Sequence, residues 1–257
     1  MPRLGLGASL STSVTPDVGF TDIYSLSFDG VNDYVDITQE GTNFPSGDSS
    51  RTISCWMKRP SAGNSPEYGY IWQYGHLALK QQFAIAMWKN TKDLYFAGHS
   101  NDINTGIDID DTDWHHIVVT FDGTTLKVYK DAGGSPHSST AGSGGDWTTL
   151  NTVLDDEHGG FSIGNRDTRD NWPFIGNVND VAIWNATLSA ADVTAIYNSG
   201  VPNDLTDSDS YDTDRTGNLV GYWKLEEGSG TSTSDGSGEG NTGTLVNGPA
   251  WDTDVPS

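Results

Sequence analysis

Short runs of alternating apolar and polar residues, separated by turn-forming residues, are the feature that most constrains how this chain folds. The alternation repeats every second residue over only a few positions, which predicts half-buried strands. The 257 residues include 31 Gly and 29 Asp but only 6 Glu, and Asp and Gly favour turns over helices. Many short strands with frequent turns predict an all-β fold, a two-sheet antiparallel β-sandwich of the jelly-roll type.

A hairpin is predicted where Asp122 and Gly123 separate the runs 116–121 and 126–129. Glycine tolerates the positive φ that a tight hairpin turn requires. The other strand candidates are 24–28, 34–37, 52–58, 70–74, 82–88, 94–97, 161–164, 178–184, 219–225 and 244–246.

One short helix is predicted near residues 189–199. Ser189 and Asp192 have the S-x-x-D spacing of a capping box, in which each side chain bonds to the other residue's backbone. Gly200 is placed to end the helix, because glycine readily takes the left-handed conformation of a helix C-terminus.

The charge of the chain excludes some partners. Thirteen Lys and Arg face 35 Asp and Glu, which gives a formal net charge of −22. Nucleic-acid binding depends on basic patches, so nucleic acid is not an expected partner. Anionic membrane surfaces are disfavoured for the same reason. No apolar run reaches the roughly 18 residues that a membrane helix needs, so no membrane insertion is predicted.

Several motifs occur together in one order. They are SLSFDGVNDYVDI (25–37), RTISCWMKR (51–59), DWHHIVVTFDGTTLKVYKD (113–131), FSIGN (161–165) and FIGNVNDVAIWNATLSAADVTAIYNSG (174–200). With these motifs the chain resembles the laminin-G-like, concanavalin A-like lectin and glucanase jelly rolls. The resemblance implies two packed antiparallel sheets, with loops at the ends or over the concave face available for ligands.

The stretch 219–251 departs from the order of that family. It looks like the stretch that usually precedes the FDG strand, yet here it comes last, after an acidic polar linker at 201–216. Either the domain is circularly permuted or a truncated second unit follows. A unit of about 40 residues could hardly bury a core of its own. We therefore expect a single jelly-roll domain at 21–257 with permuted C-terminal strands at 217–251, preceded by an N-terminal arm at 1–20.

Candidate catalytic groups are sparse. Glucanases of this architecture use an E-x-D-x-E strand, whose two Glu act as nucleophile and acid/base, and none of the six Glu here forms that triplet. There is no G-x-S-x-G elbow. Cys55 lies in a predicted core strand, where it acts as a small buried hydrophobic residue. The sequence therefore predicts a protein that is not an enzyme.

Four polar residues are candidates for a calcium site. Asp29, Asn32 and Asp33 cluster in a turn beside a strand, and Asp180 takes a position that related domains often fill with Asp. The resemblance implies either a structural Ca²⁺ or a network of hydrogen bonds between carboxylates and the turn. Asx turns alone explain Asp29 and Asn32.

The aromatic residues are the best ligand candidates. Sugar sites stack a flat ring against C–H faces and place Asp, Asn or Arg against hydroxyls. Trp172 lies beside Arg166, Asp170 and Asn171, and together with Tyr70 these residues form the predicted glycan-binding rim. Ordinary core packing is the alternative. The other loop or loop-edge aromatics are Tyr68, Trp72, Tyr74, Trp88 and Trp147.

Two function classes remain. The first is a non-catalytic virion surface protein, a capsid decoration or fibre component that also binds glycans. The chain is similar to stand-alone jelly rolls, with a Gly/Ser/Thr-rich leader and no signal peptide, carried by marine bacteriophages. The leader 1–20 would attach to a viral capsid or tail protein, with several copies of the chain on one particle. The second is a free extracellular carbohydrate-binding module or adhesin of a marine bacterium.

Overall fold

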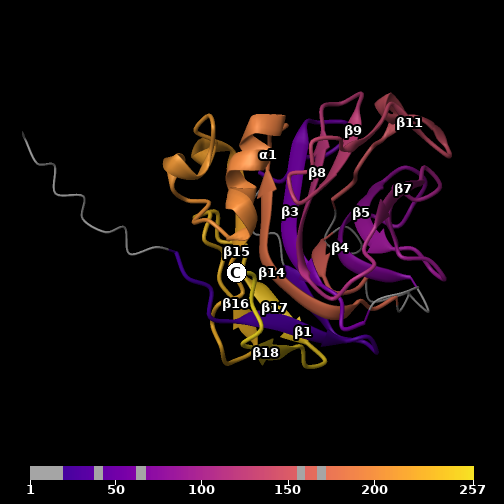
Figure 1. Ribbon diagram of the computed structural model, residues 1–257. Coiled ribbons are helices and arrows are strands. Elements are labelled where there is room, and N and C mark those ends of the chain that lie inside the picture. Colours follow the sequence, from indigo (N-terminus) through magenta and orange to yellow (C-terminus); the bar gives the residue numbers. More distant parts are fainter. Residues whose placement is uncertain (1–19, 38–42, 62–67, 155–159, 167–171) are drawn as a thin grey trace, which may run out of the picture.

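The computed structural model describes residues 20–37, 43–61, 68–154, 160–166 and 172–257. Two eight-stranded antiparallel sheets, here called sheet A and sheet B, pack face to face and confirm the predicted β-sandwich (Figure 1). The predicted helix is present as α1 (Ala190–Tyr197) and lies on the side of sheet A that faces away from sheet B (Figure 1). None of the helices in the described part of the chain is long and apolar enough to cross a membrane.

Sheet A has the strand order β10-β9-β8-β3-β14-β1-β18, and β15 also pairs with β14. The predicted hairpin joins β8 to β9, with Gly123 at a φ of 92°. The strands of this sheet are β1 (Ser25–Asp29), β3 (Arg51–Lys58), β8 (Trp114–Phe121), β9 (Leu126–Lys130), β10 (His137–Ser139), β14 (Ile175–Trp184), β15 (Leu219–Trp223) and β18 (Ala250–Asp252).

Sheet B has the order β16-β17-β2-β13-β4-β5-β6-β7. Its strands are β2 (Tyr34–Ile37), β4 (Gly69–Gly75), β5 (Gln82–Met87), β6 (Asp93–Ala97), β7 (Ile103–Asp108), β13 (Phe161–Ile163), β16 (Ser232–Thr233) and β17 (Gly243–Val246). A separate two-stranded ribbon consists of β11 (Ala141–Gly142) and β12 (Gly145–Asp146). The short 3-10 helices are η1 (Trp147–Thr149), η2 (Asn198–Gly200), η3 (Ser208–Ser210) and η4 (Thr216–Asn218).

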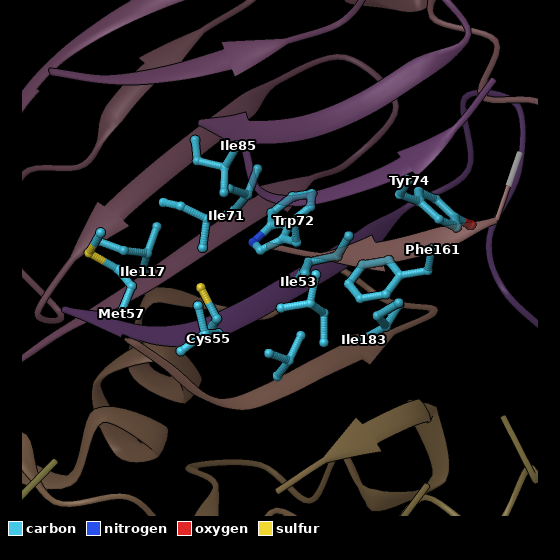
Figure 2. Close-up of a cluster of buried hydrophobic side chains, with 14 of the residues drawn as sticks. Ile53, Cys55, Met57, Ile71, Trp72, Tyr74, Ile85, Ile117, Phe161 and Ile183 are labelled. Carbon is cyan, nitrogen blue, oxygen red and sulfur yellow. The ribbon is translucent and has the colours of Figure 1, made fainter. Parts of the chain in front are cut away.

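The hydrophobic core fills the space between the sheets. Alternate residues of β3, such as Ile53 and Cys55, face Ile85 and other side chains from sheet B (Figure 2). Burial raises the pKa of the Cys55 thiol, so this residue stays uncharged and acts as the predicted core residue. Burying each such apolar side chain contributes about 1.5–3 kcal/mol to folding.

Three aromatic residues that the sequence offered as ligand candidates belong to this core. Trp72, Tyr74 and Trp147 are each 0% exposed. The register of β4 against β5 shifts between Tyr70 and Trp72, and such a bulge turns Ile71 and Trp72 both toward the core. The strict alternation assumed from the sequence fails at this bulge.

The C-terminal stretch completes both sheets of the same sandwich. Strand β15 pairs with β14, β17 pairs with β2, and β18 pairs with β1. Trp223 stacks on Phe161 with ring centroids 5.3 Å apart, and its indole N–H donates to the carbonyl oxygen of Asn241. The predicted arm at 1–20 lies outside the described residues except for Phe20.

Helix α1 begins with the predicted capping box. The Ser189 hydroxyl accepts from the Asp192 N–H, and the Asp192 carboxylate accepts from the Ser189 N–H. The prediction that Gly200 ends the helix is wrong, because Asn198 already takes the left-handed conformation at a φ of 46°. Asparagine tolerates this conformation better than most residues do.

The stretch 201–216 was expected to be a polar linker, and this expectation is wrong. Leu205 and Tyr211 are buried against Trp184 and α1, in an apolar cluster on the outer face of sheet A. The indole N–H of Trp184 donates to the Tyr211 hydroxyl at 3.2 Å. This segment and α1 therefore cover sheet A.

Candidate functional site

The candidate site lies on the outer face of sheet B. Side chains alternate across a strand, so the residues of β5 and β6 that do not point into the core point to the outer face of sheet B. They are Ala84 and Ala86 on β5 and Tyr95 and Ala97 on β6, and they are joined by Tyr70 on β4. The alanines are small, so the rings of Tyr70 and Tyr95 rise above a low floor.

Half-buried rings pack on this floor and complete what we call the aromatic cluster. Tyr68 stacks on Trp172, with centroids 4.4 Å apart and planes 29° from parallel. The Trp88 ring packs edge-on against that of Tyr95 with centroids 4.0 Å apart, and its centroid lies 5.5 Å from that of Tyr68. The aromatic cluster consists of Tyr68, Tyr70, Trp88, Tyr95 and Trp172.

Trp172 is fixed by its neighbours although polar residues precede it in the sequence. The buried Asn165 side chain accepts from the N–H groups of Arg166 and Trp172, at 2.7 and 2.9 Å. The Tyr70 N–H donates to the Trp172 carbonyl at 3.1 Å. The Arg166 guanidinium carbon lies 4.8 Å from the Trp172 ring centre and 5.4 Å from that of Tyr70. These cation–π contacts hold the guanidinium against the rings.

A pocket with a volume of about 230 Å³ opens beside the aromatic cluster. It combines flat ring faces with hydrogen-bond donors and acceptors, which is the usual composition of a small-ligand site. The residues that line it are Tyr68, Tyr70, Gln82, Tyr95, His99, Ser100, Asp102, Arg166 and Trp172.

The electrostatics of the pocket favour neutral tyrosines beside a carboxylate. Burial raises the pKa of Tyr95, and the adjacent Asp102 carboxylate raises it further. Burial also raises the pKa of Tyr70, against the opposing effect of Arg166. Both phenols therefore keep their protons at neutral pH. Asp102 accepts from the Gly98 N–H at 2.9 Å, which fixes the carboxylate at the edge of the pocket.

Three of the five predicted glycan-binding residues are brought together. Tyr70, Arg166 and Trp172 all line the pocket. The other two, Asp170 and Asn171, lie outside the described residues. Tyr68 and Trp88, which the sequence marked as loop aromatics, also belong to the cluster.

The sequence reasoning missed the far side of the pocket. Gln82, Tyr95, His99, Ser100 and Asp102 come from β5, from β6 and from the turn that follows β6. The alternation of Ala84 and Ala86 with large apolar residues was the available signal, because small residues on one face of a strand leave room for a ligand.

The predicted calcium residues in the first turn form a local hydrogen-bond network. The Asp29 carboxylate accepts from the Val31 N–H at 2.8 Å, and the Asp33 carboxylate accepts from the Asp29 N–H at 3.2 Å. The backbone carbonyl of Asn32 accepts from the side chain of Asn247. This is the carboxylate–turn arrangement that the sequence left open as the alternative to calcium.

Asp180 lies apart from that turn. Asp29 pairs with Ile175 at the start of β14, while Asp180 is further along the strand, where its carboxylate accepts from the Tyr222 hydroxyl at 2.6 Å. Across the described ranges, no group of three His, Cys, Asp or Glu residues could hold a metal ion. The four residues therefore do not fit a single calcium site, and calcium binding stays a prediction that melting in EDTA against added Ca²⁺ checks.

Comparisons with known proteins place this geometry in context. The family model described as the concanavalin A-like lectin/glucanases superfamily matches residues 29–194. A Bacteroides ovatus structure, provisionally described as a carbohydrate binding protein, has 18% sequence identity and a TM-score of 0.66. That match covers 92% of this chain and 62% of the other. The heptameric SAP-like pentraxin of Limulus polyphemus has 19% identity and a TM-score of 0.50, over 69% of this chain and 84% of the pentraxin. No curated protein matches the sequence. At these identities the structural matches show a shared fold.

Proposed function

The chain belongs to the concanavalin A-like lectin/glucanases superfamily, and from this premise we propose that it is a non-catalytic carbohydrate-binding protein. Its ligand site is the pocket beside the aromatic cluster on sheet B. The observation that carries the proposal is the combination, in one pocket, of ring faces with the carboxylate of Asp102 and the guanidinium of Arg166. The provisional description of the Bacteroides ovatus protein as carbohydrate-binding supports the same use of the fold.

Each part of the pocket has a role in holding a sugar. The ring of Trp172 stacks on the apolar C–H face of the sugar, as aromatic rings do in polar-ligand sites. Asp102 accepts hydrogen bonds from sugar hydroxyls, and Arg166 donates them. Bonds to charged groups are stronger than neutral ones, about 1.5–3 kcal/mol each. Because the ring and the guanidinium are already fixed by their contacts with each other, little conformational entropy is lost on binding.

The pocket is proposed to bind without cleaving its ligand. Hydrolysis by the usual glycosidase routes needs two carboxyl groups that flank the scissile bond. Asp102 is the one carboxylic residue among the described residues that line the pocket. A glycan-hydrolysis assay that yields released sugar would overturn this part of the proposal.

A glycan array followed by titration calorimetry tests the proposed site. We expect Trp172→Ala to weaken binding of the selected glycan at least ~10-fold, which corresponds to about 1.4 kcal/mol. The matched control is Trp114→Ala, which removes a half-buried indole at the start of β8 on the other sheet. Equal binding by the wild type and Trp172→Ala would show that the glycan site lies elsewhere.

We propose further that the protein is displayed on a virion surface, docked to a capsid or tail protein through residues 1–20. The support is the family resemblance of the sequence motifs together with the Gly/Ser/Thr-rich composition of residues 1–20. A free extracellular carbohydrate-binding module or adhesin is the alternative. Cryo-microscopy of the native particle distinguishes the two, since repeated copies on a capsid or tail support the first and protein found only free supports the second.

A further inference from the structure

We infer that the pocket binds one neutral sugar unit at the end of a glycan, not an internal stretch of a polysaccharide chain. This inference rests on the proposed function and specifies its ligand. The walls of the pocket stand on either side of the strands that form its floor.

The first wall is the turn between β6 and β7, at residues 98–102. It is clamped by the β11–β12 hairpin, because the Asp102 N–H donates to the Ser143 hydroxyl at 2.9 Å and the Ser143 N–H donates to the Asp102 carbonyl at 3.1 Å. The Gly144 N–H donates to the Asn101 side chain at 3.0 Å, and Asn101 is fully buried. This wall is therefore supported from behind and is not a loose loop.

The backbone of this turn is held in an uncommon conformation. His99 and Ser100 have φ values of 50° and 62°, in the left-handed region that residues other than glycine rarely occupy. The carbonyl of His99 accepts from the Lys80 N–H at 3.0 Å. Such conformations persist where surrounding bonds hold them, and they occur often at ligand clamps. The turn thus presents His99, Ser100 and Asp102 to the pocket.

The second wall stands across the sheet. Arg166 and Trp172 flank the connection that follows β13, and sheet B has the order β13-β4-β5-β6-β7. The two walls therefore lie on opposite sides of the floor formed by β4, β5 and β6. A glycan chain running across these strands would meet one wall or the other.

The aromatic cluster closes a third side. The Tyr68 ring, just before β4, lines the pocket on this side. The Trp88 ring, just after β5, packs edge-on against Tyr68 with ring centroids 5.5 Å apart. The volume of about 230 Å³ is also below the roughly 300–1,000 Å³ of pockets that enclose drug-sized ligands. A pocket that is small and bounded on three sides admits the end of a chain.

The charges in and around the pocket favour a neutral sugar. Arg166 is held against the rings of Tyr70 and Trp172, and Asp102 places a negative charge on the opposite wall. The protein as a whole carries a formal charge of −22, which repels anionic glycans from a distance. Sugars with carboxylate or sulfate groups are therefore disfavoured.

Titration calorimetry with sugars of increasing length tests the inference on the full chain. The probes are the methyl glycosides of glucose, galactose, mannose and arabinose, and oligosaccharides of two to four units that end in each. We expect the methyl glycoside that binds to match its oligosaccharides within ~3-fold. An affinity that grows ~10-fold or more from one unit to four overturns the inference and leaves the proposed function intact. No binding by any probe overturns both.

A second arm compares charged and neutral sugars of one shape. Methyl glucuronide and methyl galacturonide are titrated against the corresponding methyl glucoside and galactoside. We expect the acidic forms to bind at least ~10-fold more weakly. Equal or tighter binding of the acidic forms overturns the assignment to neutral sugars.

A third arm removes the support of the first wall. A Cβ on Gly144 would lie 2.2 Å from the Ser100 carbonyl oxygen, so Gly144→Ala displaces the hairpin from the turn. We expect a loss of at least ~10-fold in affinity for the methyl glycoside. Gly134→Ala is the matched control, because nothing lies within 4 Å of the added Cβ.

Ser143→Ala provides a milder change to the same wall if Gly144→Ala does not fold. It removes only the hydroxyl that accepts from the Asp102 N–H, and we expect a ~3-fold loss. Unchanged affinity in the folded variants would show that this wall does not shape the site.

Discussion

The two outer faces of the sandwich differ in how they are covered. On sheet A, α1 and the stretch 201–218 bury a continuous apolar cluster in which Trp184 is 0% exposed. On sheet B, the rings of Tyr68 and Trp172 are only half-buried and border a pocket. Both faces carry tryptophan and tyrosine, so composition does not separate them.

The difference fits our proposal that the same residue types serve stability on one face and recognition on the other. The two faces differ in whether other segments of the chain cover the aromatic rings. A partly exposed aromatic group beside polar side chains is a common feature of binding sites, whereas a fully enclosed one contributes to folding. The following predictions test that division, in order of expected effect.

The largest effect is expected from removing a tryptophan on the covered face. Trp184→Ala leaves a cavity under α1 and should lower the free energy of unfolding by about 3–5 kcal/mol, as is usual for large-to-small core changes. Trp172→Ala on the open face removes the ring that stacks on Tyr68 and should lower the free energy of unfolding by about 1 kcal/mol. Urea unfolding of both variants measures the contrast. Similar losses in the two variants would remove the proposed distinction between the faces.

A smaller effect is expected at the cap of α1, which holds the cover in place. The buried Asp192 carboxylate accepts from the N–H groups of Ser189 and Thr213 and from the Arg215 guanidinium, at 3.0–3.1 Å. Asp192→Ala should lower the free energy of unfolding by about 2 kcal/mol. The control Asp214→Ala removes an exposed carboxylate of the neighbouring loop. It should change the free energy of unfolding much less than Asp192→Ala does.

The same carboxylate gives stability a dependence on acid. Burial alone would raise the pKa of Asp192, but the hydrogen bonds to its carboxylate outweigh burial and hold the pKa below the usual value of 3.8. The stabilisation is therefore present above pH 4 and is lost as the pH falls through the lowered pKa. Melting curves of the wild type between pH 5 and pH 2.5 should fall more steeply than those of Asp192→Ala. Parallel curves would show that this carboxylate does not have the assigned role.

The last effect, which is seen only as a dependence on pH, is expected at the junction where β1 and β15 meet on β14. The Asp22 carboxyl group lies beside those of Asp180 and Glu226. Burial, followed by the charge of Glu226, raises the pKa of Asp22 to about 7, although Lys224 opposes the shift. The folded protein therefore keeps a proton here that the unfolded chain loses near pH 4.

This raised pKa makes stability fall as the pH rises. The contribution is complete below about pH 4 and is lost as the pH rises through about 7. The melting temperature should drop by a few degrees between pH 5 and pH 8, and Asp22→Asn should flatten that slope. Asp29→Asn, at the other end of β1, serves as the control and should keep the wild-type slope. A wild-type slope in Asp22→Asn would argue against a retained proton on Asp22.

Most of the fold could be predicted from the sequence because the patterns that indicate turns, caps and strands are local. The capping box of Ser189 and Asp192 and the turn at Gly123 each involve residues that are close in the chain. Trp72 was misplaced because the bulge in β4 shifts the alternation, and this shift depends on pairing with β5. The end of α1 was misjudged because Asn198 takes the conformation expected of Gly200.

The candidate site was only half predictable for the same reason. Arg166 and Trp172 are near each other in sequence and beside polar residues, so they could be recognised as a rim. Asp102 and Tyr95 reach the pocket through the order of strands in sheet B. Segments that are distant in the sequence determine which face of a strand stays uncovered. A local sequence pattern therefore does not indicate it.

The most direct test of the account is a crystal structure of the full chain with the methyl glycoside that binds best in calorimetry. We expect one sugar ring in the pocket on sheet B, stacked on Trp172 and hydrogen-bonded to Asp102. A sugar bound on the outer face of sheet A, or elsewhere with this pocket empty, would contradict it.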